Sequence, residues 1–308
     1  MLLSGFTIIR NGVKFDFPFI ESLKSALPIC DEFVINIGVS EDDTKEQILK
    51  FIATLDPKEA QKIKTFDSVW PLDDPEKRKG GHILADQTNM ALDRCMGEWC
   101  LYLQADEILH EDDLPLVRQQ LEFLSKKSNS PGDMVPDGLV FQYVHFYGNY
   151  RVIQTSRSSY RREIRVVKNQ RGIRSTGDAQ SFRHFDGNKL RAVLTKARIF
   201  HYGWVRHQEV MKLKTGFMDT LYHSSAAADQ PVTGDNYLYK NIVGLRPFRQ
   251  THPAVMHERV CNAPHFDFST VPRVFHWKDT WKLISGWIER ATGHRPFEYR
   301  NYRLIKKK

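Results

Sequence analysis

Short apolar segments alternate with amphipathic segments through the first third of the chain, and this alternation limits the possible folds more than any other feature. Four short runs of β-branched or apolar residues predict strands, at residues 5–10, 32–38, 62–66 and 98–105. The segments between them carry apolar residues at spacings of three and four, which predicts helices at residues 15–27, 45–54 and 83–95. Strands and helices that alternate in this way form βαβ units. We therefore expect an α/β fold with a Rossmann-like, mostly parallel sheet flanked by helices.

The pattern changes beyond Pro131. Three further segments alternate between apolar and polar residues like strands of an antiparallel sheet, at residues 138–148, 162–169 and 197–206. The sheet as a whole is therefore predicted to be mixed.

The C-terminal part has a different texture from the rest. Residues 224–236 are poor in large apolar side chains, and we expect a linker or a mobile loop there. A helix is predicted at residues 277–290, with Trp281, Ile284 and Ile288 on one face. We therefore divide the chain into a main domain at residues 1–223 and a C-terminal helical extension at residues 224–308.

The chain is basic, with a formal net charge of +8 and a pI near 9.2. This charge favours a polyanionic partner such as nucleic acid, an anionic membrane surface or a phosphorylated substrate, and a solvated basic surface is the plain alternative. No apolar run is long enough to span a membrane and the start lacks a secretory signal, so a cytoplasmic location is expected. Four cysteines without a CxxC pair predict reduced, mostly buried thiols.

Negative charge is nevertheless concentrated in one segment, CLYLQADEILHEDD, at residues 100–113. Asp106 and Glu107 come just past the predicted fourth strand, at the edge where parallel sheets bind ligands. Carboxylate oxygens at this edge can hold Mg²⁺ or Mn²⁺ against a diphosphate. Asp106 is therefore predicted to bind a metal, and the alternative is that it only begins a turn. Asp112 and Asp113 are expected to cap the next helix.

Several segments are similar to one enzyme family. GEWCLYLQADE resembles the G-(D/E)-(W/Y)-apolar-DADE segment of the family 2 glycosyltransferases, which have the GT-A fold. FTIIRN is similar to their first strand, CDEFVINIGVSEDDT to their second strand and its loop, and HILADQTNMALDRCMGEW to the helix before the metal motif. RIFHYGWVR resembles a later strand that ends in a histidine. The likeness to a bacterial subgroup with QADE at the metal motif runs through HWKDTWKLISGW.

The resemblance implies an enzyme of cell-surface polysaccharide biosynthesis whose catalytic domain is residues 1–223. It implies an inverting transfer of a sugar from a nucleotide-diphosphate donor to a glycan or lipid-linked acceptor. A divalent ion, Mn²⁺ or Mg²⁺, would take up the charge of the diphosphate. Asp106 would be its direct or water-mediated ligand, and His201 would complete the metal or diphosphate site. A strand-end histidine bonded to backbone is the alternative for His201.

A further set of residues is expected to bind the nucleotide sugar. Arg10 and Asn11 follow the first strand, beside the binding crevice of such sheets. Arg78, Lys79 and Gly80 lead into a helix, where backbone NH groups and cations favour phosphate. The set is completed by Asp42, Gln87, Asn89, Gln104 and Glu107.

The sequence departs from the family pattern at two positions. Gln104 stands where the family motif usually begins with Asp, and an amide is a weaker metal ligand than a carboxylate. Gly38 stands where family members often have an Asp that contacts the base.

The general base is sought in the loop at residues 171–185, where the family presents its catalytic carboxylate. Asp178 is the single acid in this loop and is our candidate, although Gly177-Asp178 is also an ordinary turn signal. Glu163 is a weaker option because arginines flank it, which favours a structural ion pair.

Other functions stay open at this point. A protein that binds nucleotide sugars without turnover is one alternative, given Gln104. The basic tract at residues 156–174 raises nucleic-acid binding, which we do not expect because no recognised module accompanies the tract.

The Trp-bearing helix at residues 277–290 could lie on an anionic membrane, with the protein peripheral at the inner face of the membrane. A core or subunit contact is the more common role of such a stripe.

Overall fold

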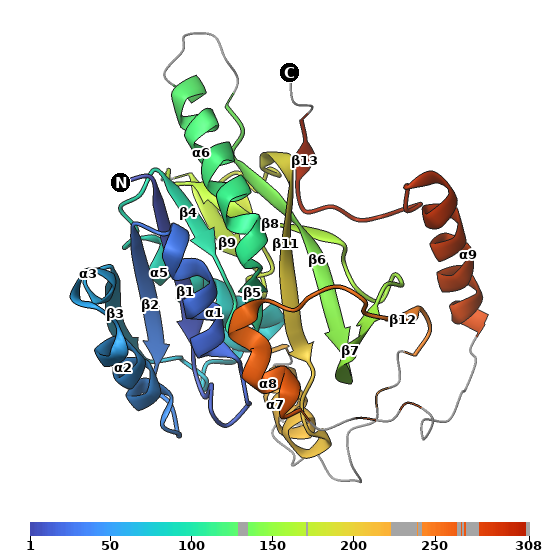
Figure 1. The fold of residues 1–308 in the computed structure, drawn as a ribbon, viewed down its shortest axis with the longest axis horizontal. Coiled ribbons are helices and arrows are strands. Elements are labelled where there is room, and N and C mark those ends of the chain that lie inside the picture. Colours follow the sequence, from blue (N-terminus) through green and yellow to red (C-terminus); the bar gives the residue numbers. More distant parts are fainter. Residues whose placement is uncertain are drawn as a thin grey trace.

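The computed structural model describes residues 1–128, 135–170, 172–222, 239, 242–263, 266, 268 and 277–305. Figure 1 shows one twisted sheet across the molecule, with helices α1 (Phe19–Ala26) and α6 (Leu114–Ser128) on the side toward the viewer and α5 (His82–Leu92) behind it. The α/β architecture with a mixed sheet flanked by helices is as predicted.

The N-terminal part of the sheet is parallel. Its strands lie in the order β3 (Ile63–Ser68), β2 (Glu32–Gly38), β1 (Leu3–Ile9) and β4 (Trp99–Tyr102). The helical connections between them are α1, α2 (Thr44–Thr54), α3 (Pro57–Ala60), α4 (Pro75–Arg78) and α5. Because helices cover both faces, β1 and β2 are buried along their whole length.

The rest of the sheet is mixed. β8 (Arg162–Lys168) runs antiparallel to β4, and β6 (Gly138–Tyr147) runs antiparallel to β8. The edge is formed by β7 (Asn149–Gln154) and β12 (Leu245–Pro247), both in antiparallel pairs.

One strand departs from the predicted direction. β11 (Arg191–Trp204) was expected as an antiparallel strand, but it lies parallel to β6. The hairpin of β9 (Ile173–Thr176) and β10 (Ser181–His184) carries the chain across between β8 and β11, so β11 returns in the direction of β6. Its other contacts are antiparallel β5 (Glu107–Leu109) and parallel β13 (Arg303–Leu304).

Two local predictions need correction. The helix predicted at residues 15–27 begins only at Phe19, because Pro18 precedes it and Asp16 has a positive φ of 49°. Asp113 does not cap the helix that follows it. Its carboxylate instead accepts hydrogen bonds from the backbone and side chain of Arg198, at 2.9 and 2.8 Å.

Apolar residues fill both sides of the sheet. Phe33 and Leu101 pack with α1 and α6 on one side, and Phe6 and Tyr102 pack with α5 on the other. Cys30, Cys95 and Cys100 are free and buried, while Cys261 is free and exposed. Three of the four cysteines are therefore buried, as predicted.

Further helices lie around this core, at the end of the main domain and in the C-terminal extension. These helices are α7 (Gln208–Tyr222), α8 (His257–Cys261) and α9 (Trp277–Thr292). Single 3₁₀ turns lie elsewhere along the chain, at Leu27–Ile29, Lys79–Gly81, Glu111–Asp113 and Ala254–Met256. The predicted loop at residues 224–236 lies outside the described residues. Within the part of the chain that the structure describes, no helix is long and apolar enough to cross a membrane.

Ion pairs attach the C-terminal segment to the main sheet. Arg161, just before β8, contacts Glu298 at 2.7 Å and Glu289 of α9 at 2.7 Å. Arg157 donates to the backbone oxygen of Phe297 at 3.0 Å. Several arginines of the basic tract at residues 156–174 are therefore bound within the molecule instead of facing solvent.

A second buried ion pair lies at the centre of the molecule. Glu107 and Arg165 are each 0% exposed, and Arg165 donates to both carboxylate oxygens of Glu107, at 2.7 and 2.8 Å. The hydroxyl of Tyr143 donates to the same carboxylate at 2.7 Å. The pair joins β8 to β5.

We predict that Arg165→Met lowers the free energy of unfolding by about 3–5 kcal/mol, because it leaves the Glu107 carboxylate buried without a counter-charge. Urea unfolding measures this change. The double change Glu107→Gln with Arg165→Met is expected to cost less than Arg165→Met alone.

The matched control is Arg174→Met, which removes an arginine that pairs with Asp93 at 2.8 Å at the surface. Such an exposed pair contributes about 0–1 kcal/mol. A loss for Arg165→Met no larger than that of Arg174→Met would contradict the prediction.

Candidate functional site

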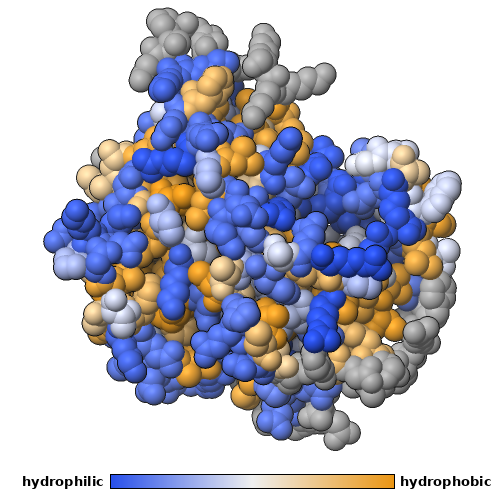
Figure 2. Space-filling model, in the orientation of Figure 1, coloured by the Kyte–Doolittle hydropathy of each residue, from blue (hydrophilic) through white to orange (hydrophobic). Residues whose placement is uncertain are grey.

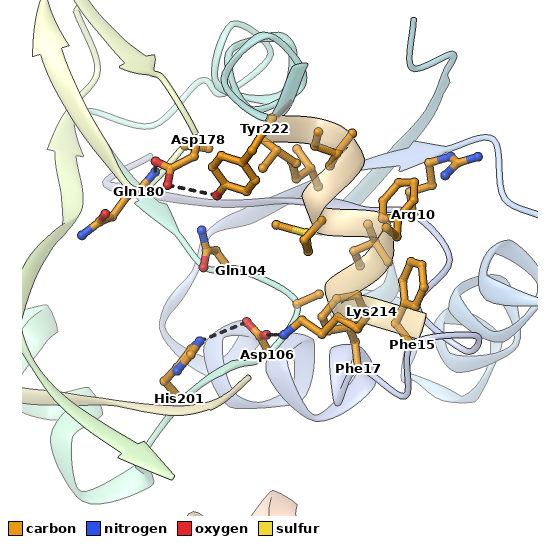
Figure 3. A pocket seen from close by; sticks show the side chains of 18 of the residues that line it. Arg10, Phe15, Phe17, Gln104, Asp106, Asp178, Gln180, His201, Lys214 and Tyr222 are labelled. Carbon is orange, nitrogen blue, oxygen red and sulfur yellow. Dashed lines mark hydrogen bonds and ion pairs between the residues drawn. The ribbon is translucent and has the colours of Figure 1, made fainter. Parts of the chain in front are cut away.

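A cavity of about 430 Å³ lies at the carboxyl ends of β1 and β4 (Figure 3). Its walls come from the residues that follow these two strands, the turn between β9 and β10, the end of β11, and α7. Five of the predicted site residues line it: Arg10, Gln104, Asp106, Asp178 and His201. The cavity thus lies where a parallel sheet is expected to bind ligands.

Asp106 is surrounded by cationic and imidazole groups at one end of this cavity. It is 6% exposed, and its Oδ2 lies 3.2 Å from Nζ of Lys214 and 3.8 Å from Nη2 of Arg206. Its Oδ1 lies 3.7 Å from Nε2 of His201. The structure therefore brings Asp106 and His201 together, as the sequence resemblance implied, but it adds two cations that were not expected.

These contacts set the charge of each group. Burial alone would raise the pKa of Asp106, but the charges of Lys214 and Arg206 outweigh it and hold the pKa well below its usual range. Burial lowers the pKa of Lys214 to about 8. At neutral pH Asp106 is therefore a carboxylate, and Lys214 is mostly an ammonium.

His201 is neutral, and its tautomer follows from its neighbours. Burial lowers the pKa of His201 to about 4 and that of His145 to about 3. Nε2 of His145 lies 2.7 Å from the backbone oxygen of Tyr160 and must donate, because a carbonyl only accepts. Nδ1 of His145 then accepts from Nδ1 of His201, 3.0 Å away. Nε2 of His201 is left with a lone pair beside Asp106.

These groups can be tested against a divalent ion. The carboxylate of Asp106 and the lone pair of His201 are suitable ligand atoms. Lys214 and Arg206, however, already bring two positive charges to one carboxylate, so the cluster has a net charge of +1 before any ion is added. The described residues contain no group of three or more acidic, His or Cys side chains that could hold a metal. The residues present therefore do not fit a resident divalent ion.

The opposite wall of the cavity carries the candidate base, Asp178. Its Oδ2 accepts a hydrogen bond from the hydroxyl of Tyr222 at 3.1 Å, and its Oδ1 accepts one from the backbone of Gln180 at 3.2 Å. Burial and the nearby Asp178 charge raise the pKa of Tyr222, so Tyr222 stays a donor. Figure 3 shows Gln104 between this wall and the cluster around Asp106.

Arg10 closes the cavity beside β1. Its guanidinium carbon lies 5.4 Å from the ring centre of Phe217 and 6.0 Å from that of Trp70. Its Nε donates to the backbone oxygen of Val39 at 2.9 Å, and its Nη2 contacts Glu41 at 3.2 Å. Among the described residues, the buried Nη1 of Arg10 and Nε1 of Trp70 have no hydrogen-bond acceptor. Buried donors of this kind are suited to an anionic or carbonyl-bearing ligand.

Several predicted nucleotide-sugar residues hold the structure together instead of lining the cavity. Asn11 and Asp42 fix the loops after β1 and β2, since Asn11 accepts from the backbone of Glu41 and Asp42 accepts from the backbone of Lys14. Glu107 is taken up by its ion pair with Arg165.

The two predicted residues on α5 are also structural. Gln87 accepts a hydrogen bond from Asn36 of β2 at 2.9 Å. Asn89 binds the backbone of Ser175, which fixes β9 against α5.

The predicted phosphate segment, Arg78 to Gly80, does not line the cavity, but the residue after it supports the cavity wall. Gly81 has a φ of 75°, and a Cβ placed on it would lie 2.9 Å from Cβ of Asp178. Gly81 thus lets the loop approach the candidate base closely.

Sequence reasoning missed α7, which supplies Lys214, Phe217 and Tyr222 to the cavity. A signal was present in the sequence. Lys214 lies at helical spacing from Met211, Phe217, Met218 and Leu221, so it is a lysine within an apolar stripe. A cation on the buried face of a helix needs a partner, and that need points to a site.

Comparison with solved structures returns TarS from S. aureus and a mannosyltransferase. Residues 1–349 of TarS from S. aureus in complex with UDP-GlcNAc match at 20% identity and a TM-score of 0.33, over 51% of this chain and 38% of that chain. The same TarS segment in complex with UDP matches at 14% identity and a TM-score of 0.38, over 72% and 65% of the two chains.

The mannosyltransferase PcManGT from Pyrobaculum calidifontis, in complex with GDP-Man and Mn²⁺, matches at 18% identity and a TM-score of 0.29, over 47% and 35% of the two chains. In all three cases the match spans less than two thirds of the other chain. No family model matches this chain, and no curated protein matches it. Because these TM-scores are low, function is inferred below from the residues of the cavity.

We predict that Gly81→Ala destabilises the protein by about 2–4 kcal/mol, because it adds a clash with Asp178 to the cost of a positive φ. Gly80→Ala is the matched control, since Gly80 has a φ of 65° but a Cβ there would meet only His82 at 3.7 Å. Its expected cost is about 1–2 kcal/mol. Urea unfolding compares the two variants, and equal losses would mean that Gly81 is not packed against Asp178.

Proposed function

We propose that this chain is an inverting glycosyltransferase that moves a sugar from a nucleotide-diphosphate donor to a hydroxyl of a glycan or lipid-linked acceptor. One observation carries the proposal: a single cavity has a cationic end, around Lys214, and a carboxylate, Asp178, on its opposite wall. Such a cavity suits an anionic leaving group at one end and deprotonation of an acceptor at the other.

The donor is assigned to the cationic end. Lys214 and Arg10 both line the cavity, and their charges suit a diphosphate. Gln104 lies between the two ends and can hydrogen-bond to a ribose or sugar hydroxyl. The lone pair on His201 can accept a hydrogen bond from another such hydroxyl.

In the proposed reaction each proton and electron pair has a defined destination. Asp178 takes the proton of the acceptor hydroxyl as that oxygen forms a bond to the anomeric carbon of the donor. The bond from this carbon to the phosphate oxygen breaks, and its electron pair leaves with the nucleoside diphosphate. Attack from the face opposite the leaving group inverts the anomeric centre.

The resemblance to family 2 also implies Mn²⁺ or Mg²⁺, which would supply Lewis-acid stabilisation of the leaving diphosphate where bound. The solved structures above contain UDP-GlcNAc, UDP or GDP-Man, the last together with Mn²⁺. In this chain the site where such an ion would lie already holds Lys214, so no step of the proposed reaction is assigned to a metal.

The alternative functions receive less support. Nucleic-acid binding would need a basic surface open to solvent, but Arg165 is fully buried and Arg161 is held by two glutamates. Binding without turnover would not require a carboxylate held at the wall of the cavity, as Asp178 is.

Features of α9 support the proposal of a lipid-linked acceptor. Trp277 is 80% exposed and Trp287 is 66% exposed, and the same helix carries Lys282 and Arg290. Figure 2 shows a largely hydrophilic face on which hydrophobic residues gather between β12 and α9. Exposed tryptophans with cations nearby suit the interface of an anionic membrane, where a lipid-linked acceptor would lie.

We predict that the protein sediments with vesicles that contain an anionic phospholipid and not with neutral vesicles. Trp277→Ser combined with Trp287→Ser is expected to weaken this binding at least tenfold. Phe123→Ser, which removes a 58% exposed ring from α6, is the control and should bind as wild type does. Equal vesicle binding by the tryptophan variant and the Phe123→Ser variant would contradict membrane contact. So would a wild-type dimer in solution that becomes a monomer when the two tryptophans are replaced.

The proposed enzyme is tested with a panel of nucleotide sugars and purified protein. We predict that Asp178→Asn lowers turnover by about 10²–10⁴-fold and leaves binding of the nucleoside diphosphate within about twofold, because it removes only a general base. Mass spectrometry and nuclear magnetic resonance measure the product and its anomeric configuration.

Asp219→Asn is the matched control, since Asp219 is an exposed acid of α7 that lines the same cavity. It is expected to keep turnover within a few fold of wild type. Loss of turnover in Asp219→Asn but not in Asp178→Asn would assign the base to Asp219. Binding of a nucleotide sugar without any turnover by wild type would contradict the enzyme proposal for that panel.

A further inference from the structure

Lys214 holds the position at Asp106 that the sequence resemblance assigns to a divalent ion. Its Nζ lies 3.2 Å from Oδ2 of Asp106 and 2.8 Å from the backbone oxygen of Gly203. An ammonium has three hydrogens to donate, so two such contacts leave one for a ligand. Lys214 lines the cavity, so that ligand can be a molecule bound there.

The surroundings of Lys214 hold the ammonium in place. It lies 5.1 Å from the ring centre of Phe17 and 5.9 Å from that of Trp204, both within the range of cation–π attraction. The lack of a side chain at Gly203 lets Asp106 and His201 lie close to the backbone there, because a Cβ would lie 2.5 Å from the ring of His201 and 2.9 Å from Oδ2 of Asp106. The backbone thus passes close to the pair without a side chain in between.

The charges near this end of the cavity favour an anion. Lys214, Arg206 and Asp106 sum to +1, while Arg10 in the same cavity is paired with Glu41. Arg206 is itself fixed, since it donates to the backbone oxygens of Phe15 at 2.6 Å and Gly203 at 2.6 Å. The cluster is therefore a preformed cationic site, which needs no added ion to attract a diphosphate.

Resting on the function proposed above, we propose that Lys214 replaces the divalent ion: its ammonium, anchored on Asp106 and Gly203, binds the diphosphate and neutralises the charge that develops on the leaving group. Asp106 is then a positioning residue for Lys214. Donor binding and transfer by this chain do not require a divalent metal.

Isothermal calorimetry tests this with UDP, GDP and ADP as probes, each in a chelating buffer and again with Mn²⁺. We expect wild type to bind at least one of them in the chelator and to gain less than about threefold from Mn²⁺. Lys214→Met, which keeps most of the length of the side chain and removes the charge, should weaken binding in the chelator by about 10–100-fold, the size of a charge-assisted hydrogen bond.

The same variant should reverse the metal dependence. Without the ammonium, Asp106 and His201 are free to hold an ion, so Mn²⁺ is expected to restore part of the affinity of Lys214→Met. Lys214→Arg keeps the charge and should stay independent of Mn²⁺. Lys212→Met is the matched control, because it removes a lysine from the same helix at a position that does not line the cavity.

Direct binding of Mn²⁺, followed by electron paramagnetic resonance, gives a second measurement that needs no variant. When wild-type protein is added to Mn²⁺ and UDP, the Mn²⁺ spectrum should stay the same as that of the Mn²⁺–UDP complex in solution. A protein-bound Mn²⁺ in wild type, or nucleotide binding that occurs only with Mn²⁺, would overturn the replacement by Lys214 and leave the proposed glycosyltransferase intact. Failure of wild type to bind any nucleoside diphosphate, with or without Mn²⁺, would overturn both.

Discussion

The pairing of Asp106 with Lys214 is the interaction on which the cavity depends. Asp106 lies just past β4, and Lys214 lies on α7, more than a hundred residues later in the chain. Their contact joins α7 to the carboxyl end of β4, and α7 in turn supplies Phe217 and Tyr222 to the cavity. Arg206 strengthens this arrangement, because it joins the segment before α7 to the loop after β1 through the backbone of Phe15.

Asp106 and its neighbour Glu107 are both buried carboxylates, but they serve different purposes. Glu107 is enclosed by Arg165 and Tyr143 and joins the strands of the mixed half of the sheet. Asp106 lines the cavity together with Lys214, one of its two counter-charges. Two adjacent acids thus divide into one that stabilises the fold and one that prepares a binding site. The same contacts explain why a basic chain buries arginines instead of presenting them all to a polyanion.

Much of the fold could be predicted from the sequence, because the N-terminal strands and helices follow the periodicity of their apolar residues. β2 begins and ends where the pattern of residues 32–38 placed it. The direction of β11 could not be predicted in this way, since alternation of side chains is the same in parallel and antiparallel strands. It is set by the path of the chain through β9 and β10.

The site was only partly predictable for a similar reason. Strand ends place residues at one edge of a sheet, and Arg10, Gln104 and Asp106 were found from their positions there. Asn11 and Asp42 come from the same region, but their side chains turn to backbone partners, which strand position does not reveal. Lys214 could not be placed from strand ends at all, because its role arises from a contact between distant segments.

We propose that this chain supplies its own cation, Lys214, to a diphosphate. The most direct measurement is a crystal structure with UDP and Mn²⁺ both supplied, with anomalous scattering used to find manganese. We expect a phosphate oxygen within hydrogen-bond distance of Nζ of Lys214, and no manganese peak between Asp106 and the diphosphate. A manganese peak bound by Asp106 and His201, with Lys214 displaced from the carboxylate, would contradict it.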